Sequence, residues 1–191
     1  MENFAETFEL IAKQTQQNLP ILLSMILLLA GIHLLNWVLK YRLLIFGIYP
    51  RRLRGLPGIM FAPFLHADFN HFFFNAIPLF VLADFMLLYG FNFFIKASLA
   101  IILLSGSLLW LFGRNAIHIG ASALITGYWA YLVINTYHQG GLLAITLGIV
   151  CVYYFSGIFF GIFPMRRGVS WEGHLFGLIA GILTNYGFFL V

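Results

Sequence analysis

Residues 118–127 read HIGASALITG, and in this run Ser122 stands between small residues at the point where an apolar segment begins. If a helix starts there, its free backbone N–H groups and the positive end of its dipole point at the serine, an arrangement that stabilises a developing oxyanion. Most serines in membrane helices have a simpler role, because they donate to a carbonyl one turn earlier. Taken alone, the run leaves open whether Ser122 is a nucleophile or a tolerated polar residue.

The composition of the rest of the chain is that of a membrane protein. Its 191 residues are 62% hydrophobic and 8% charged, whereas soluble domains carry about 25% charged residues. The net charge of +4 suits contact with anionic membrane lipids, and the sequence has no compact basic patch of the kind that binds nucleic acid. The single cysteine, Cys151, excludes an intramolecular disulfide.

Six segments are apolar enough to cross the roughly 30 Å of hydrocarbon in a bilayer, for which a helix needs about 20 residues. Open strands would leave backbone groups unpaired in lipid, so we expect helices. The segments cover about residues 19–38, 70–89, 93–112, 121–137, 142–163 and 174–191. The predicted fold class is therefore an all-α membrane protein, a bundle of six transmembrane helices.

Two further parts of the chain are predicted to lie at the membrane surface. Residues 1–18 place apolar side chains at helical spacing between charged ones, which predicts an amphipathic interfacial helix ahead of a six-helix domain over residues 19–191. Residues 39–69 contain three prolines and three glycines, which break any long helix, yet they are apolar and basic. We expect a long interfacial loop between the first two spans.

The second span carries polar side chains that need a reason to be in a membrane. His71 and Asn75 are four residues apart, so they share one helix face, which we expect to point into the bundle. Ordinary hydrogen bonding between helices, worth about 0.6 kcal/mol a pair, explains them equally well. His66 and His71 are five apart with no acidic partner beside them, which is poor spacing for a zinc site.

The sixth span places an imidazole on a face built for close packing. His174, Gly177 and Gly181 lie on one side of a helix, and the two glycines form the G-x-x-x-G pattern of tight helix contacts. With Gly120, they are the predicted helix-packing residues. A lone histidine on a packed helix is more often structural. If the neighbour is the fourth span, however, His174 can reach Ser122, and a serine beside a histidine is the minimum set for nucleophilic hydrolysis.

Three motifs in this order resemble the rhomboid family of intramembrane serine proteases, in its bacterial, six-helix form. They are HADFNHFFFN at residues 66–75, GASA at residues 120–123 and GHLFGLIAG at residues 173–181. The resemblance covers nearly the whole chain beyond the N-terminal segment. It implies a compact six-helix bundle with a water-filled cavity that opens to one face of the membrane.

The same resemblance implies the chemistry of the site. Ser122 would be the nucleophile and His174 the general base and acid, in a dyad without an aspartate. The backbone N–H of Ser122, with His71 and Asn75, would stabilise the oxyanion. The family uses no metal and no cofactor, and its substrates are single-pass transmembrane proteins cut near the membrane edge. The sequence leaves the oligomeric state and the natural substrate open.

Some positions depart from the family pattern. Ala123 stands where the family usually has glycine, and Thr126 stands where it often has an aromatic ring stacked on the histidine. The alternative function is therefore a catalytically weak or inactive rhomboid-like protein that binds transmembrane segments, although such proteins typically lose the serine or the histidine. We also expect His118 to be solvated near the cavity mouth, and Glu172 to face a loop or the lipid headgroups.

The resemblance and the charge distribution disagree on topology. Family membership implies a multi-pass protein of the bacterial inner membrane, with cytoplasmic termini and an active site that faces the extracytoplasmic side. The positive-inside rule would place the basic loops in the cytoplasm. We prefer the family topology, because the rule is a bias and five of the eight charges belong to one long loop. The basic residues of the loops after spans one, three and five are Lys40, Arg42, Arg51, Arg52, Arg54, Arg114, Arg166 and Arg167.

Overall fold

The structure, a computed structural model, describes residues 3–163 and 170–189. Within these ranges the chain is helical, and the predicted all-α class is confirmed. The α-helices are α1 (Phe4–Val38), α2 (Gly58–Phe61), α3 (Phe69–Leu87), α4 (Phe91–Phe112), α5 (Ser122–Gln139), α6 (Leu142–Phe155) and α7 (Trp171–Phe189). The 3-10 helices are η1 (Arg42–Phe46), η2 (Leu53–Gly55), η3 (Ala62–Phe64) and η4 (Ser156–Ile162).

The predicted count of six helices is not confirmed, because the described ranges hold seven α-helices. The additional one, α2, is a four-residue helix within the linker between α1 and α3. By length and composition, four described stretches are apolar enough to cross a membrane: Phe4–Val38, Phe69–Leu87, Phe91–Phe112 and Leu142–Ile162. The two long helices outside this set, α5 and α7, carry buried polar side chains such as Thr126 and Asn185. These polar side chains lower the mean hydropathy of the two helices, and their hydrogen bonds are formed within the protein.

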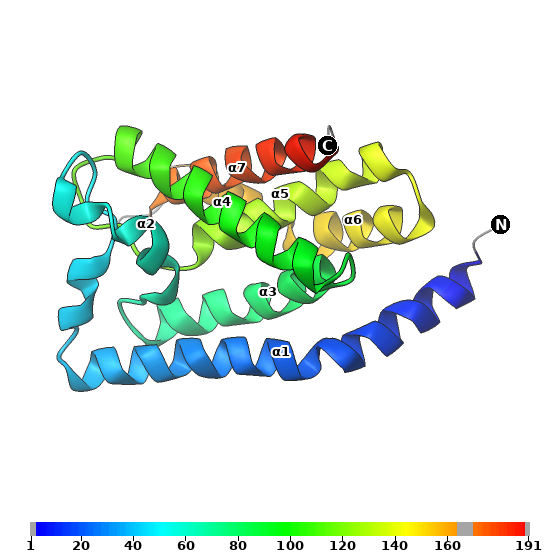
Figure 1. Ribbon diagram of the computed structural model, residues 1–191, viewed down its shortest axis with the longest axis horizontal. Coiled ribbons are helices and arrows are strands. Elements are labelled where there is room, and N and C mark those ends of the chain that lie inside the picture. The colour runs from blue at the N-terminus through cyan, green and yellow to red at the C-terminus, as the bar shows by residue number, and fades with distance from the viewer. Residues whose placement is uncertain (1–2, 164–169, 190–191) are drawn as a thin grey trace.

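Helix α5 lies at the centre of the bundle, packed against α7, α4, α6 and α3 (Figure 1). Residues 124–132 of α5 are all buried. Its fully buried Tyr128 and Leu132 belong to the same apolar core as Leu82 of α3 and Ile101 of α4. Ser122, the first residue of α5, is half-buried and precedes this buried stretch by two residues.

The N-terminal segment and the first predicted span form one helix. Helix α1 runs without interruption from residue 4 to 38 with Pro20 inside it, so the predicted boundary after residue 18 does not coincide with a helix end. The N-terminal half is tied to α3, because Thr15 Oγ1 donates to Asp84 Oδ2 at 2.6 Å and Asn18 Nδ2 donates to Asp84 Oδ1 at 2.8 Å. The interfacial position of residues 1–18 stays a prediction.

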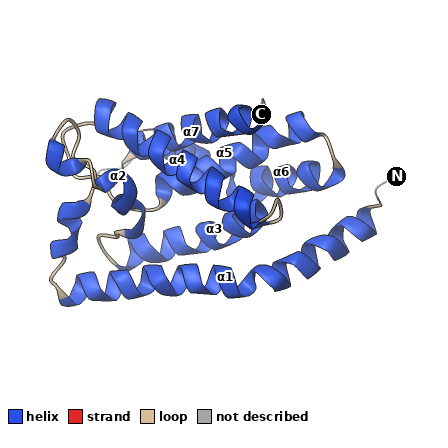
Figure 2. Cartoon of the chain, in the orientation of Figure 1, coloured by secondary structure: helices blue, strands red, loops and turns tan. Residues whose placement is uncertain are grey.

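The linker between α1 and α3 is folded onto the rest of the protein. Arg51 Nη1 donates to the carbonyls of Leu111 and Gly113, at 3.1 and 2.8 Å, where α4 ends. An antiparallel bridge joins Ile48 of the linker to His118, just before α5. The expected loop is instead a set of short helices connected by turns (Figure 2). It lies at the end of the bundle where α3, α5 and α7 begin (Figure 1).

Candidate active site

Helices α5 and α7 touch through their backbones. A Cβ added at Gly177 would collide with the carbonyl oxygen of Ala123, and one added at Gly181 would collide with that of Gly127. From the first contact to the second, the position advances by four residues on α5 and by four residues on α7. The two helices therefore lie side by side and run in the same direction. Ser122 immediately precedes the first of these contacts on α5, and His174 stands one turn before it on α7. The two glycines therefore pack helices as expected.

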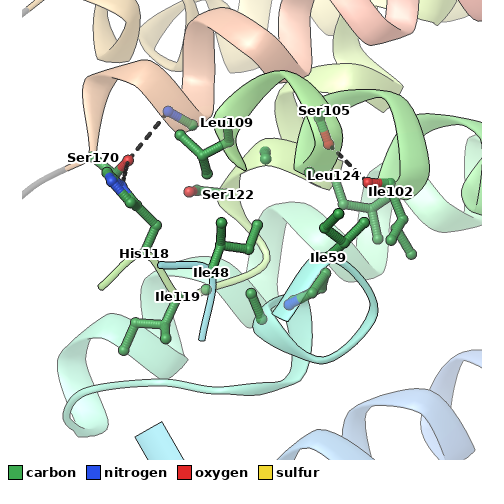
Figure 3. A pocket seen from close by; sticks show the side chains of 16 residues that line it. Ile48, Ile59, Ile102, Ser105, Leu109, His118, Ile119, Ser122, Leu124 and Ser170 are labelled. Atoms are coloured by element: carbon green, nitrogen blue, oxygen red, sulfur yellow. Dashed lines mark hydrogen bonds between the residues drawn. The ribbon is translucent and has the colours of Figure 1, made fainter. Parts of the chain in front are cut away.

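Ser122 is the first residue of α5, and no side chain caps this helix start. The backbone N–H groups of a first turn have no partner within the helix, so they are available to an anion at the serine. Ser122 lines a cavity of about 30 Å³ with His118, Ser170 and apolar side chains (Figure 3). Such a volume is sufficient for a water molecule.

The carbonyl of Ser122 is held by the residue that departs from the family pattern. Thr126 Oγ1 donates to Ser122 O at 2.8 Å, and the Thr126 side chain is buried. This is the bond to the carbonyl one turn earlier that threonine commonly makes in a helix, and it occupies the place where an aromatic ring was expected by the resemblance. Among the described residues the Ser122 hydroxyl itself makes no hydrogen bond to His174, and catalytic hydrogen bonds are often long before substrate binds.

The orientation of His174 follows from one hydrogen bond. Its Nδ1 lies 2.9 Å from the carbonyl oxygen of Gly161, at the end of η4. A carbonyl can only accept, so Nδ1 carries the proton and Nε2 keeps a free lone pair. The ring can approach this closely because residue 161 is a glycine, whose missing Cβ would lie against the imidazole. Gly161 thus selects the tautomer that can take a proton through Nε2.

His71 of α3 reaches the segment just before the serine. Two features of position 120 disfavour any residue larger than glycine. Its φ is +106°, which other residues rarely adopt, and a Cβ there would lie 2.6 Å from His71 Nε2. The Gly120 N–H donates to Ala62 O at 2.9 Å. Gly120 therefore accommodates an imidazole of α3, and the helix-packing role that we expected for it stays a prediction. The His71 side chain of α3 thus lies beside the segment that leads into α5.

Asn75 was expected to act with His71 at the oxyanion, but its side chain forms a hydrogen bond within α3. Its Nδ2 donates to the carbonyl oxygen of His71, one turn earlier on α3, at 2.6 Å. No hydrogen bond joins Asn75 to Ser122 in the described part of the chain, so its role at the oxyanion stays a prediction.

His66 supports His71 from the linker side. Its ring is fully buried and lies edge-on to the His71 ring, with the centroids 5.1 Å apart. Burial lowers the pKa of His66 to about 3, and the neighbouring charges of His71 and His33 act in the same direction. His66 therefore stays neutral at physiological pH and serves as a packing partner for the imidazole that faces Gly120.

Two further polar residues near the starts of α5 and α7 are buried. His118 is 3% exposed, and Nδ1 of its ring bonds to Ser170 Oγ at 2.7 Å. Burial lowers the pKa of His118, although its hydrogen bond to the Arg114 carbonyl opposes the shift. Glu172 is 4% exposed, and its Oε1 lies 3.3 Å from Arg114 Nε. The expected solvation of His118 is wrong, whereas Glu172 faces the loop between α4 and α5, one of the two roles expected for it. Ser170 and Arg114, the partners of these two residues, each lie more than 50 residues away in the sequence, where no local pattern reveals them.

Comparison with known proteins places this geometry in a family. The family model described as the Rhomboid domain matches residues 54–191, which include α3, α5 and α7. An uncharacterized protein of Mycobacterium tuberculosis (strain ATCC 25618 / H37Rv) is 37% identical over 174 residues, covering 86% of this chain and 72% of the relative. An uncharacterized protein of Mycobacterium leprae (strain TN) is 33% identical over 175 residues, covering 86% of this chain and 69% of the relative.

Proposed function

The chain belongs to the rhomboid family, and we propose that it is an intramembrane serine endopeptidase with Ser122 and His174 as its catalytic dyad. The observation that carries the proposal is the side-by-side contact of α5 and α7, which holds both residues at the same end of the helix pair. The hydrogen bond from His174 Nδ1 to Gly161 supports it, because it leaves Nε2 free to act as a base.

In the proposed reaction, Ser122 Oγ attacks the carbonyl carbon of a peptide bond while His174 Nε2 takes the hydroxyl proton. The N–H groups at the start of α5, with His71 and Asn75, stabilise the negative oxygen of the tetrahedral intermediate. The imidazolium then gives its proton to the leaving amine, and an acyl ester remains on Ser122. Water, deprotonated by the same Nε2, hydrolyses that ester. The Gly161 carbonyl keeps the ring oriented throughout, the task that an aspartate performs in a triad.

The proposed substrates are single-pass transmembrane proteins. We propose that the six long helices all span the membrane, with membrane lipids around them. Ser122 and His174 stand at the starts of their helices, so cleavage is expected near one edge of the bilayer. A helical peptide bond is shielded from attack, and the substrate must therefore unwind at the site of cleavage.

Covalent labelling tests the proposed nucleophile. We expect a fluorophosphonate probe to modify the folded protein at Ser122, because the proposed base His174 takes its hydroxyl proton and the N–H groups at the start of α5 stabilise the resulting adduct. Mass spectrometry of the labelled peptides identifies the modified residue. Ser105 and Ser170 line the same cavity and should stay unmodified, which makes them internal controls. Absence of an adduct at Ser122 would contradict the proposal and favour a protein that binds transmembrane segments without cutting them.

We further propose that the protein lies in the bacterial inner membrane with its active site on the extracytoplasmic side. The basic loops oppose this orientation, but two of their charges have structural partners. Arg51 binds the carbonyls at the end of α4, and Arg114 pairs with Glu172. Arg166 and Arg167 lie outside the described residues. A charge held by the fold is a weaker signal for the side on which a loop resides.

Cysteine accessibility decides the orientation. Asn115 and Gln139 are both exposed and lie at opposite ends of the bundle, and the natural Cys151 is buried. In intact cells, a membrane-impermeant maleimide should label Asn115→Cys, whereas Gln139→Cys should react only after permeabilisation. The reverse pattern would mean that the active site faces the cytoplasm.

A further inference from the structure

A part-buried hydrogen bond joins the segment before α5 to the start of α7. His118 Nδ1 lies 2.7 Å from Ser170 Oγ (Figure 3), and His118 Nε2 lies 3.0 Å from the Arg114 carbonyl oxygen. Since that carbonyl only accepts, Nε2 carries the proton of the neutral ring and Nδ1 accepts from the Ser170 hydroxyl. We refer to the contact between His118 and Ser170 as the His118–Ser170 bridge.

Both ends of the bridge are rigidly attached to their own segments. Ser170 Oγ also accepts from the N–H of Gly173 at 3.2 Å, which caps the first turn of α7. The backbone of His118 exchanges two hydrogen bonds with Ile48 of the linker, at 2.8 and 2.9 Å. A displacement of one residue of the bridge is therefore transmitted to the helix start that follows it.

The bridge has the same sequence offset from each dyad residue. His118 is four residues before Ser122, and Ser170 is four residues before His174. Below the dyad, the backbones of α5 and α7 touch at Gly177. The bridge adds a second connection beyond the dyad, supported by the ion pair between Arg114 and Glu172. A single connection determines the distance between α5 and α7 at one point only. Two connections on opposite sides of the dyad also determine the angle between the first turns of the two helices.

We propose that His118 and Ser170 are positioning residues that hold Ser122 and His174 at their working separation. This inference rests on the proposed function, because the separation matters only if the two residues react together. Neither His118 nor Ser170 transfers a proton in the reaction. They act by preventing the first turn of α7 from moving relative to the first turn of α5. A misplacement of about 1 Å between reacting groups can lower a rate by about 10²-fold.

The first measurement is the rate constant for fluorophosphonate labelling of Ser122, together with the final labelled fraction. For Ser170→Ala and for His118→Leu, we expect the rate constant to fall by about 10- to 100-fold with the labelled fraction unchanged. The double variant should react no more slowly than the slower single variant, because both remove the same bond. Ser170→Thr keeps the hydroxyl and should restore most of the rate. Ser24→Ala, which removes a hydroxyl bonded within α1, is the control.

A merely structural role gives a different result. Loss of folded protein would lower the labelled fraction and leave the rate constant of the remaining sites unchanged. An unchanged rate constant in Ser170→Ala would therefore overturn the positioning role.

The second measurement does not depend on activity. Backbone amide exchange should rise over residues 114–121 in Ser170→Ala, and over residues 170–175 in His118→Leu, because each substitution releases the opposite segment. If exchange rises only next to the substituted residue, the bridge does not connect the helix starts and the inference is wrong. If exchange rises on both sides while the unmodified protein fails to react with the probe, the connection stands and the proposed protease function is wrong.

Discussion

Replacing His174 by alanine is expected to lower the rate of peptide cleavage by about 10⁴- to 10⁶-fold, and replacing Ser122 by alanine is expected to do the same. The serine hydroxyl is a weak nucleophile without a base to take its proton, and the base is useless without the serine. The measurement uses a synthetic single-span peptide with a glycine–proline break near one end, incorporated into detergent micelles with the purified protein. Either variant retaining more than about 1% of the original rate would contradict the dyad.

The double variant separates a dyad from two independent contributions. Residues that act as one unit are strongly non-additive, so Ser122→Ala combined with His174→Ala should be no slower than either change alone. Independent effects would instead multiply. Far-ultraviolet circular dichroism of all three variants should match the unmodified protein, because both side chains lie at helix starts and neither is in the apolar core.

Replacing Gly177 by alanine is the second change with a large expected effect. The new Cβ would collide with the backbone carbonyl of Ala123, and a backbone atom cannot turn aside as a flexible side chain does. The two helices must move apart, which separates the residues at their starts. We expect a loss of about 10²-fold in the rate of peptide cleavage and a lower midpoint of thermal unfolding, since overpacking costs about 1–3 kcal/mol.

Gly187 offers a matched control in the same helix. A Cβ on Gly187 would meet nothing within 4 Å. Both Gly187→Ala and Gly177→Ala gain about 1 kcal/mol from the better helix propensity of alanine. The difference in activity and thermal midpoint between the two variants therefore reports the collision with Ala123 alone. Equal activity and equal thermal midpoints in the two variants would show that the contact of α5 with α7 does not hold the dyad together.

Much of the fold could be predicted because lipid and backbone chemistry act on local patterns. Apolar runs of membrane length become helices wherever the backbone has no other partner, and each long helix covers most or all of its predicted segment in the described ranges. The close packing at Gly177 and Gly181 was also evident from spacing alone. The one-turn helix α2 and the continuity of α1 past residue 18 were not predicted. Neither the linker nor the sequence around Pro20 carries a local pattern that indicates them.

The sequence by itself determined which residues share a helix face, and hence that His174 stands above a tightly packed pair of glycines. Only the tertiary structure decided which partners the buried polar groups have. The carbonyl of Gly161 orients His174, Ser170 binds His118, and Arg114 pairs with Glu172. Helical periodicity relates residues three or four apart, whereas these last two contacts join segments more than 50 residues apart. They form only when α5 and α7 are packed side by side, so no local pattern encodes them.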